Sequence, residues 1–348
     1  MRRATALAAS IVGIALLGLV LVGNAEAQTS TPTPAPPGSI TGTVTNGTAG
    51  ITSVAGATMQ LLAIDSAGAI TSQDAPVTDG RFSFTPPASS TVTYVLRATY
   101  QGIDYLDEQP ILLSPALPTD TRTITVYETT SDAPALSIDS TVVSVQGLDR
   151  AQGQLTLQRE DQVINPGDRV YIGRDDHVSF RMPAPEGVVD ILPVDSVDGE
   201  SKLDGGTATS TQPLKPGINL IVTRYTVSYD PADAAYHARV TTPLPAAHME
   251  FWVPIRFVED VTPGPNAVRT QDRTLQDEKW HVVARTDAAT EGEALTVTPE
   301  GLGGASAVNP LTQQPQAAIA GALALGALLA GVLLLSRVRI SWGGGTDA

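Results

Sequence analysis

The chain has 348 residues and a formal net charge of −15, and charged residues make up 16% of it. This acidic balance disfavours binding to nucleic acid and to anionic lipid headgroups, because both carry dense negative charge. The sequence has no cysteine, which rules out thiol catalysis and cysteine-ligated metal centres. Glycine (31) and proline (26) are frequent, and together with many threonines they favour strands and turns over helices.

The N-terminus has the three parts of a signal peptide. Arg2 and Arg3 form a basic start, residues 6–22 are mostly apolar, and residues 25–27 form a small-x-small cleavage motif. The sequence therefore predicts a signal peptide over residues 1–27. An uncleaved N-terminal anchor is the alternative, because the apolar stretch is just long enough to span a bilayer.

A second apolar run lies near the C-terminus. Residues 317–335 contain no charge and, at 1.5 Å per residue, would extend over roughly 28 Å, close to the thickness of a bilayer core. Arg337 and Arg339 follow directly, and basic residues just past a span favour the cytoplasmic side. We expect a transmembrane helix over 317–335 and a short cytoplasmic tail over 336–348. A buried soluble helix is the alternative.

These two ends predict a single-pass protein of the cell membrane whose large middle part lies outside the cytoplasm. The chain has 3 lysines against 18 arginines, a composition that suggests a bacterial protein. The sequence does not separate the cell surface from the periplasm.

Residues 28–38 are rich in threonine and proline and are expected to form an extended linker. From residue 39 to 130 the pattern is that of short strands separated by turns. Along residues 92–99, one apolar set alternates with a mostly polar set: Val92, Tyr94, Leu96 and Ala98 with Thr93, Val95, Arg97 and Thr99. Asp79-Gly80 is a turn that leads into Phe82 and Phe84 on one face. Alternation with turns every 8 to 12 residues is typical of an all-β sandwich.

An ordered series of short motifs in this segment resembles the carboxypeptidase regulatory-like domain. The motifs are Gly42-x-Val44, Val54-Ala55-Gly56-Ala57 before Leu61-Leu62, Thr78-Asp79-Gly80-Arg81-Phe82-x-Phe84, Tyr94-x-Leu96-x-Ala98, and Tyr100-x-Gly102 with Tyr105. The resemblance covers residues 39–130. It implies a transthyretin-like sandwich, a fold also described as carbohydrate-binding-like, without catalytic residues of its own.

Residues 131–302 form a second β-rich region for which no family is recognised. Alternating apolar sets predict a second, immunoglobulin- or transthyretin-like sandwich over about 136–257, and further strands at 258–302 either complete it or stand apart. A polar linker, 303–316, leads to the anchor. The predicted core-facing sets are Leu155 and Leu157; Val178, Phe180 and Met182; Ile218, Leu220 and Val222; and Met249, Phe251, Val253 and Ile255.

No catalytic motif stands out, and no catalytic, cofactor-binding or metal-binding residue is predicted. His177 follows two aspartates, Asp175 and Asp176; this trio could bind a cation, but a solvated turn explains it better. The acidic loop at 195–200 could in principle bind calcium, yet it lacks the regular spacing of a complete calcium loop.

Aromatic side chains provide the remaining candidates for ligand contact. Tyr100 and Tyr105 lie in the first region, and Trp252 lies on the opposite face of its strand from Phe251 and Val253. If exposed, these rings could stack on sugars.

The sequence as a whole predicts a membrane-anchored, non-catalytic binding or assembly protein that presents β-sandwich domains to a protein partner. Binding of envelope carbohydrate through Tyr100, Tyr105 and Trp252 is the alternative. An enzyme or enzyme accessory subunit would require a polar cluster assembled from distant loops, which residue spacing cannot reveal.

Overall fold

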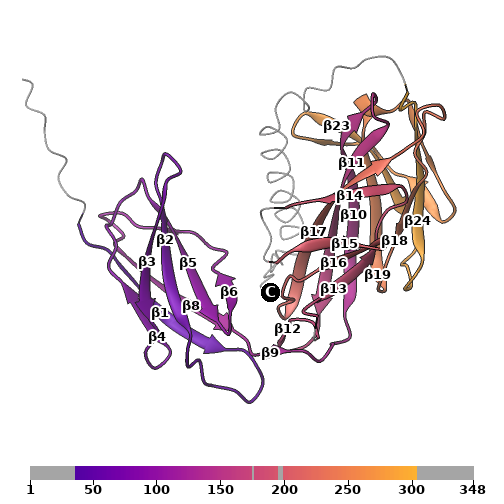
Figure 1. Ribbon diagram of the computed structural model, residues 1–348. Coiled ribbons are helices and arrows are strands. Elements are labelled where there is room, and N and C mark those ends of the chain that lie inside the picture. Colours follow the sequence, from indigo (N-terminus) through magenta and orange to yellow (C-terminus); the bar gives the residue numbers. More distant parts are fainter. Residues whose placement is uncertain (1–35, 175, 195–198, 304–348) are drawn as a thin grey trace, which may run out of the picture.

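The computed structural model describes residues 36–174, 176–194 and 199–303. Figure 1 shows two β-sandwich-like domains in this part of the chain, which meet at the short strands β9 (Thr129–Thr130) and β12 (Val170–Tyr171). Apart from one 3₁₀ turn, η1 (Ile255–Phe257), the regular elements described are β-strands. The all-β prediction is confirmed.

The predicted signal peptide (1–27), transmembrane helix (317–335) and tail (336–348) lie outside the described residues, as do most of the two linkers. Within the part that the structure describes, no helix is long and apolar enough to cross a membrane. The membrane topology therefore stays a prediction.

The first domain consists of two facing sheets. One has the strand order β4-β1-β8, and the other has the order β3-β2-β5-β6 with β7 added to β5. Strand β1 pairs with β4 in antiparallel and with β8 in parallel orientation. The strands are β1 (Ser39–Asn46), β2 (Thr58–Ile64), β3 (Ile70–Pro76), β4 (Arg81–Phe84), β5 (Thr93–Tyr100), β6 (Ile103–Leu106), β7 (Ile111–Leu112) and β8 (Thr119–Val126).

Alternation in the sequence places the core of this domain correctly. Along β5 every second side chain is buried, including Tyr94 and Leu96. Phe82 and Phe84 share one face of β4, as predicted, and lie in the same core. Asp79 and Gly80 both have positive φ and form a two-residue hairpin turn closed by hydrogen bonds between Thr78 and Arg81.

Gly42 makes the close contact between β1 and its neighbours possible. A Cβ atom at this position would lie 2.5 Å from the ring of Phe82 and 2.1 Å from the carbonyl oxygen of Arg122. The aromatic ring of β4 therefore occupies the space that any other residue would need.

The second domain is built on an eight-stranded sheet with the order β14-β17-β11-β10-β19-β23-β21 and with β22 also paired to β23. Two three-stranded sheets, β13-β16-β15 and β18-β24-β20, contribute to the same core. The strands are β10 (Ser137–Asp149), β11 (Gln154–Asn165), β13 (Phe180–Pro183), β14 (Val188–Leu192), β15 (Ser201–Asp204), β16 (Thr207–Ser210), β17 (Gly217–Ser228), β18 (Ala238–Thr241), β19 (Ala246–Pro254), β20 (Asp260–Pro263), β21 (Ala267–Arg269), β22 (Arg273–Leu275), β23 (Glu278–Arg285) and β24 (Ala294–Glu300).

The strands after residue 257 do not stand apart from those before it. Strand β24 pairs with β18 on one side and β20 on the other, and β23 pairs with β19 in the large sheet. Leu295 and Val297 of β24 lie in one continuous core with Phe251 of β19 and Leu157 of β11. The late strands thus complete the second domain.

The predicted core face of β17 is wrong. Ile221, Tyr225 and Val227 face the main core, whereas Ile218 is 48% exposed and Val222 lies on the opposite face. Apolar residues occupy both alternation phases of this strand, so the pattern alone could not fix its face, and a shift of one residue reverses every side chain.

Candidate functional site

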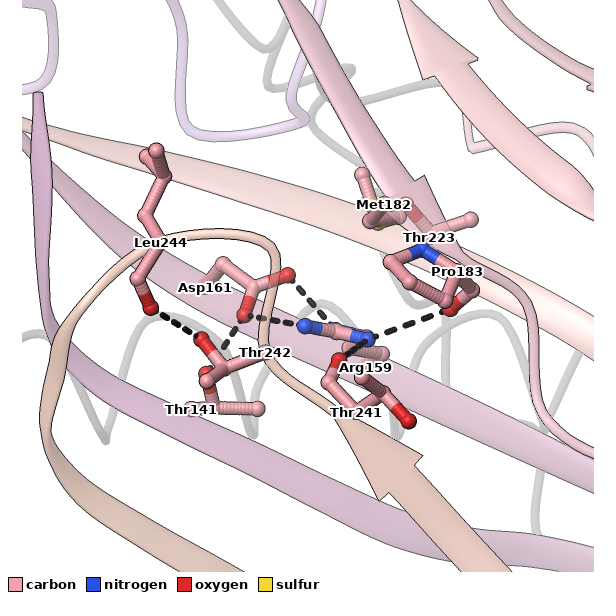
Figure 2. Close-up of polar contacts among 9 residues, drawn as sticks. All are labelled: Thr141, Arg159, Asp161, Met182, Pro183, Thr223, Thr241, Thr242 and Leu244. Atoms are coloured by element: carbon pink, nitrogen blue, oxygen red, sulfur yellow. Dashed lines mark hydrogen bonds and ion pairs between the residues drawn. The ribbon is translucent and has the colours of Figure 1, made fainter. Parts of the chain in front are cut away.

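A buried ion pair on β11 forms the centre of a polar cluster in the interior, drawn in Figure 2. The guanidinium of Arg159 donates to both carboxylate oxygens of Asp161. The distances are 2.7 Å from Nε to Oδ2 and 3.1 Å from Nη2 to Oδ1. The two side chains are 1% and 0% exposed, respectively. Thr141 of β10 donates its hydroxyl to Asp161 Oδ1 at 2.6 Å.

The remaining hydrogen-bonding capacity of Arg159 is directed to the backbone. Its Nη1 donates to the carbonyl oxygens of Thr241, at 3.2 Å, and Pro183, at 3.4 Å. Burial is the largest single influence on Arg159 and lowers its pKa, but the charge of Asp161 and the hydrogen bonds to it together raise that pKa above its usual value. The pair is therefore charged and compensated, and it joins the large sheet to strands β13 and β18.

Tyr225 lies close to this pair in the same core. Its side chain is fully buried, and its hydroxyl has no hydrogen-bond partner among the described residues. Burial raises the pKa of Tyr225 to about 12, so the phenol is neutral. Because the ion pair is inaccessible to solvent, a substrate could not reach it, and we assign the cluster a structural role.

Sequence reasoning missed Arg159 and Asp161, although a signal was present. Leu155, Leu157 and Val163 face the core, and the two charged residues occupy the same alternation phase between them. When the core-facing positions of a strand include an Arg and an Asp two residues apart, the pattern indicates a buried ion pair.

The three predicted ligand-contact residues are all buried. Tyr100 is 5% exposed, Tyr105 is 6% exposed and Trp252 is 3% exposed. The hydroxyl of Tyr105 donates to the carbonyl oxygen of Tyr127 at 3.1 Å, and burial raises the pKa of Tyr105 to about 12. None of these three rings is exposed to solvent, and exposed rings are what a sugar-binding surface formed by these residues would require.

Trp252 lies in a small cluster on the face of the large sheet opposite the main core. Its ring packs edge-on against Trp280, with the ring centroids 6.2 Å apart, and its Nε1 donates to Glu250 Oε2 at 2.7 Å. Arg273 of β22 lies over the Trp252 ring at 4.8 Å and also contacts Glu250 at 3.0 Å. The hairpin that carries β22 thus covers the tryptophans.

The two acidic segments considered as cation sites are only partly described by the structure. Asp176 forms an ion pair with Arg181, and His177 occupies a turn with positive φ, while Asp175 lies outside the described residues. In the acidic loop, residues 195–198 also lie outside them, and Glu200 pairs with Lys202 at 2.9 Å. Across the described ranges, no group of three or more His, Cys, Asp or Glu side chains could hold a metal ion.

His281 lies in a small polar cluster with Asp272 and Arg269. Its Nδ1 lies 2.9 Å from Asp272 Oδ1, and Arg269 Nη2 lies 2.7 Å from the same ring nitrogen. The hydrogen bond with His281 lowers the pKa of Asp272. The hydroxyl of Thr270, on the same segment, donates to the carbonyl oxygen of Val282 and is therefore not directed at the histidine.

An apolar surface lies on the outer face of the β3-β2-β5-β6 sheet. Strand register aligns Ile70 with Ile64, Ile64 with Thr93, and Thr93 with Leu112, so a row crosses four strands. Ile70 and Leu112 are 64% and 66% exposed. The outer apolar patch consists of Leu62, Ile64, Ile70, Val95, Leu106 and Leu112.

The outer apolar patch extends onto a terminal strand through Ile70. Strand β3 is the last strand of its sheet, and six of its seven residues are exposed. At the other end of the patch, charges are paired with each other, since Arg97 lies 3.3 Å from Asp104. Exposed apolar side chains gathered on one sheet face form a candidate interaction surface.

Comparison with known proteins yields no family. No protein-family model matches the chain, and no curated protein matches it. Among solved structures, the chain is similar to an M1 zinc metallopeptidase from Deinococcus radiodurans bound to a Tyr-Ser-Ala substrate, with a TM-score of 0.30 and 10% identity over 49% of this chain and 46% of that chain. A second structure of M1 zinc metallopeptidase from Deinococcus radiodurans matches 48% of this chain and 42% of that chain, again with a TM-score of 0.30 and 10% identity.

The chain thus spans less than half the length of these solved structures. At this TM-score the similarity supports no inference about activity.

Proposed function

We propose that this chain is a membrane-anchored, extracytoplasmic binding or assembly protein that is not catalytic and that presents its first β-sandwich domain to a protein partner. The observation that carries the proposal is the outer apolar patch, where Ile70 and Leu112 are exposed on the outer face of the sheet. Covering such a face by another protein would remove apolar area from water, at about 25 cal/mol per Å².

The location of the protein is part of the proposal. A signal peptide over 1–27 would export the chain, and a helix over 317–335 would retain it in the membrane with a short cytoplasmic tail. The motifs around Asp79-Gly80 and Tyr94 support a carboxypeptidase regulatory-like domain over 39–130, a kind of sandwich that serves as an accessory or adhesion module.

The non-catalytic part of the proposal is supported by where the polar groups lie. Arg159 and Asp161 neutralise each other in the interior, and Glu250 and Arg273 are engaged around Trp252. The carbohydrate alternative lacks an exposed aromatic ring among the three residues named for it.

The experiment is affinity capture with the full-length chain, solubilised from the membranes of the cells that make it. We expect one protein to be retained by the wild-type chain and lost with Ile70→Asp and Leu112→Asp. Ser83→Asp is the matched control, because Ser83 is exposed on the opposite sheet of the same domain. Equal capture by all three variants would contradict a role for the outer apolar patch.

A further inference from the structure

The two domains are connected by more than a linker, because a later segment of the second domain comes back to pair with the end of the first. Strand β12, which follows β11 of the second domain, pairs in parallel with β9 at the end of the first domain. The amide of Val170 donates to the carbonyl oxygen of Glu128 at 2.8 Å, and the amide of Ile172 donates to Thr130 at 3.1 Å. Main-chain hydrogen bonds thus join segments about 40 residues apart in sequence.

Strand β12 places neighbouring side chains in different cores. Val170 is fully buried in the core of the first domain, with Ile172 packed against that core. Tyr171, between them, belongs to the core of the second domain, and its backbone exchanges two hydrogen bonds of 2.9 Å with Leu214. Because side chains alternate along a strand, one short segment holds both domains.

Polar contacts surround this segment. Asp168 accepts the amide of Ala49 at Oδ2, at 2.8 Å, and the hydroxyl of Thr48 at its carbonyl oxygen, at 3.1 Å. Thr48 is 2% exposed, and its hydroxyl also accepts the amide of Glu128 at 2.9 Å. The loop after β1 is therefore fixed to both sides of the junction.

On the first-domain side of the junction, the carboxylate of Glu128 accepts several hydrogen bonds. It accepts the hydroxyl of Tyr100 at 2.7 Å and the side-chain amide of Asn46 at 2.9 Å. From the second domain, Lys215 lies 5.1 Å above the ring of Tyr105 and donates its ammonium to the carbonyl oxygen of Asp104. Two separate segments of the second domain thus contact the first.

We infer that the two domains form one rigid body, an elbow held by strand β12, rather than two modules that move independently. Domains in one chain move relative to each other by default unless a well-packed interface joins them. Here a shared two-stranded sheet and a side chain inserted into the neighbouring core supply that interface. A rigid elbow would hold the outer apolar patch in a fixed position relative to the C-terminal end of the second domain, which lowers the ordering cost of binding.

The absence of cysteine in the sequence makes a direct test possible. Spin labels on Ser83→Cys in the first domain and Arg239→Cys in the second, both exposed positions, would report the interdomain distance in the full-length chain in detergent. We expect a single distance distribution as narrow as that of an intradomain pair, Ser72→Cys with Ser83→Cys. A broad or multiple distribution in the wild-type background would overturn the inference.

Val170→Asp should release the elbow, because a carboxylate cannot be accommodated in the apolar core of the first domain. We expect the interdomain distribution to become clearly broader than that of the wild-type chain. Val268→Asp, at a valine that is 47% exposed, is the matched control and should leave it unchanged.

The intradomain pair shows whether the first domain stays folded in the Val170→Asp background. If it does not, Asp168→Ala replaces Val170→Asp, with Asp204→Ala at an exposed position as its control. An interdomain distribution that stays narrow in the folded variant would contradict the role of β12. This test does not depend on whether a partner binds the outer apolar patch.

Discussion

The two domains use polar and apolar side chains in opposite ways. The first domain has an apolar core and leaves the outer apolar patch uncovered, with Leu112 66% exposed. The second domain buries an ion pair, Arg159 with Asp161, in its core and covers its outer-face tryptophans with the β22 hairpin. The charged pair is buried and stabilises the second domain, whereas the surface proposed for binding, the outer apolar patch, consists of aliphatic side chains.

This contrast predicts two kinds of mutant. Substitutions at the buried pair should cost stability, and substitutions in the outer apolar patch should cost only binding. The following predictions test it, from the largest expected loss of stability to the smallest.

The largest loss should follow removal of one charge of the buried pair. Asp161→Asn keeps the shape of the side chain but leaves the guanidinium of Arg159 buried without a counter-charge, so we expect the free energy of unfolding to fall by about 3–5 kcal/mol. Urea unfolding followed by tryptophan fluorescence measures it, because Trp252 and Trp280 both report on the second domain.

Asp204→Asn is the control for this variant, because Asp204 is exposed on β15, and it should change stability by less than about 0.5 kcal/mol. A loss from Asp161→Asn no larger than that of the control would show that the pair is dispensable.

A smaller loss should follow crowding of the first core. In Gly42→Ala the new methyl group would meet the Phe82 ring and the backbone oxygen of Arg122, and relief of this overlap should cost about 1–3 kcal/mol. Calorimetry of the full-length chain would show a lower transition for the first domain. Thr45→Ala, at an exposed position of the same strand, should leave the transition in place.

The contribution of Glu128 should be about 1 kcal/mol, because its hydrogen bonds are partly exposed to solvent. The hydroxyl of Tyr100, which donates to Glu128, holds the pKa of that carboxyl below its usual range. A lowered pKa in the folded state means that the stabilisation is present above the unfolded-state pKa and is lost as the pH falls through the folded-state pKa.

The wild-type chain should accordingly exceed Glu128→Gln in stability at pH 7, and the gap should close below about pH 4. A gap independent of pH between these values would mean that the carboxylate charge is not involved.

The smallest effect on stability is expected in the outer apolar patch. The Leu112 side chain is largely in solvent, so Leu112→Asp should change the free energy of unfolding by less than about 0.5 kcal/mol. Urea unfolding tests this directly. A loss of several kcal/mol would mean that the patch packs against another part of the chain.

Alternation in the sequence predicted the local elements well where one face of a strand is apolar. The β5 pattern, the Asp79-Gly80 turn and the opposite orientation of Trp252 and Phe251 follow from side-chain periodicity. The face of β17 did not, because Ile218 and Ile221 offer apolar residues in both phases.

Longer-range features lay beyond the reach of the pattern. Exposure of Tyr105 depended on the neighbouring strands, which periodicity does not describe. Val170 enters the core of the first domain from a segment assigned to the second, and no local signal distinguishes it from any other buried valine. The only sequence signal for the buried Arg159 was that it occupies the same alternation phase as the core residues of its strand. A charged residue at such a position departs from the usual rule that buried positions are apolar.

The central claim is that the outer apolar patch binds a protein partner, and site-specific photo-crosslinking in intact cells tests it most directly. A photoreactive residue would replace Leu112 in the full-length chain, and another would replace Ser83 on the opposite sheet as the control. The account predicts one discrete adduct from position 112 that position 83 does not give and that Ile70→Asp abolishes. Identical adducts from both positions, or none from position 112, would contradict it.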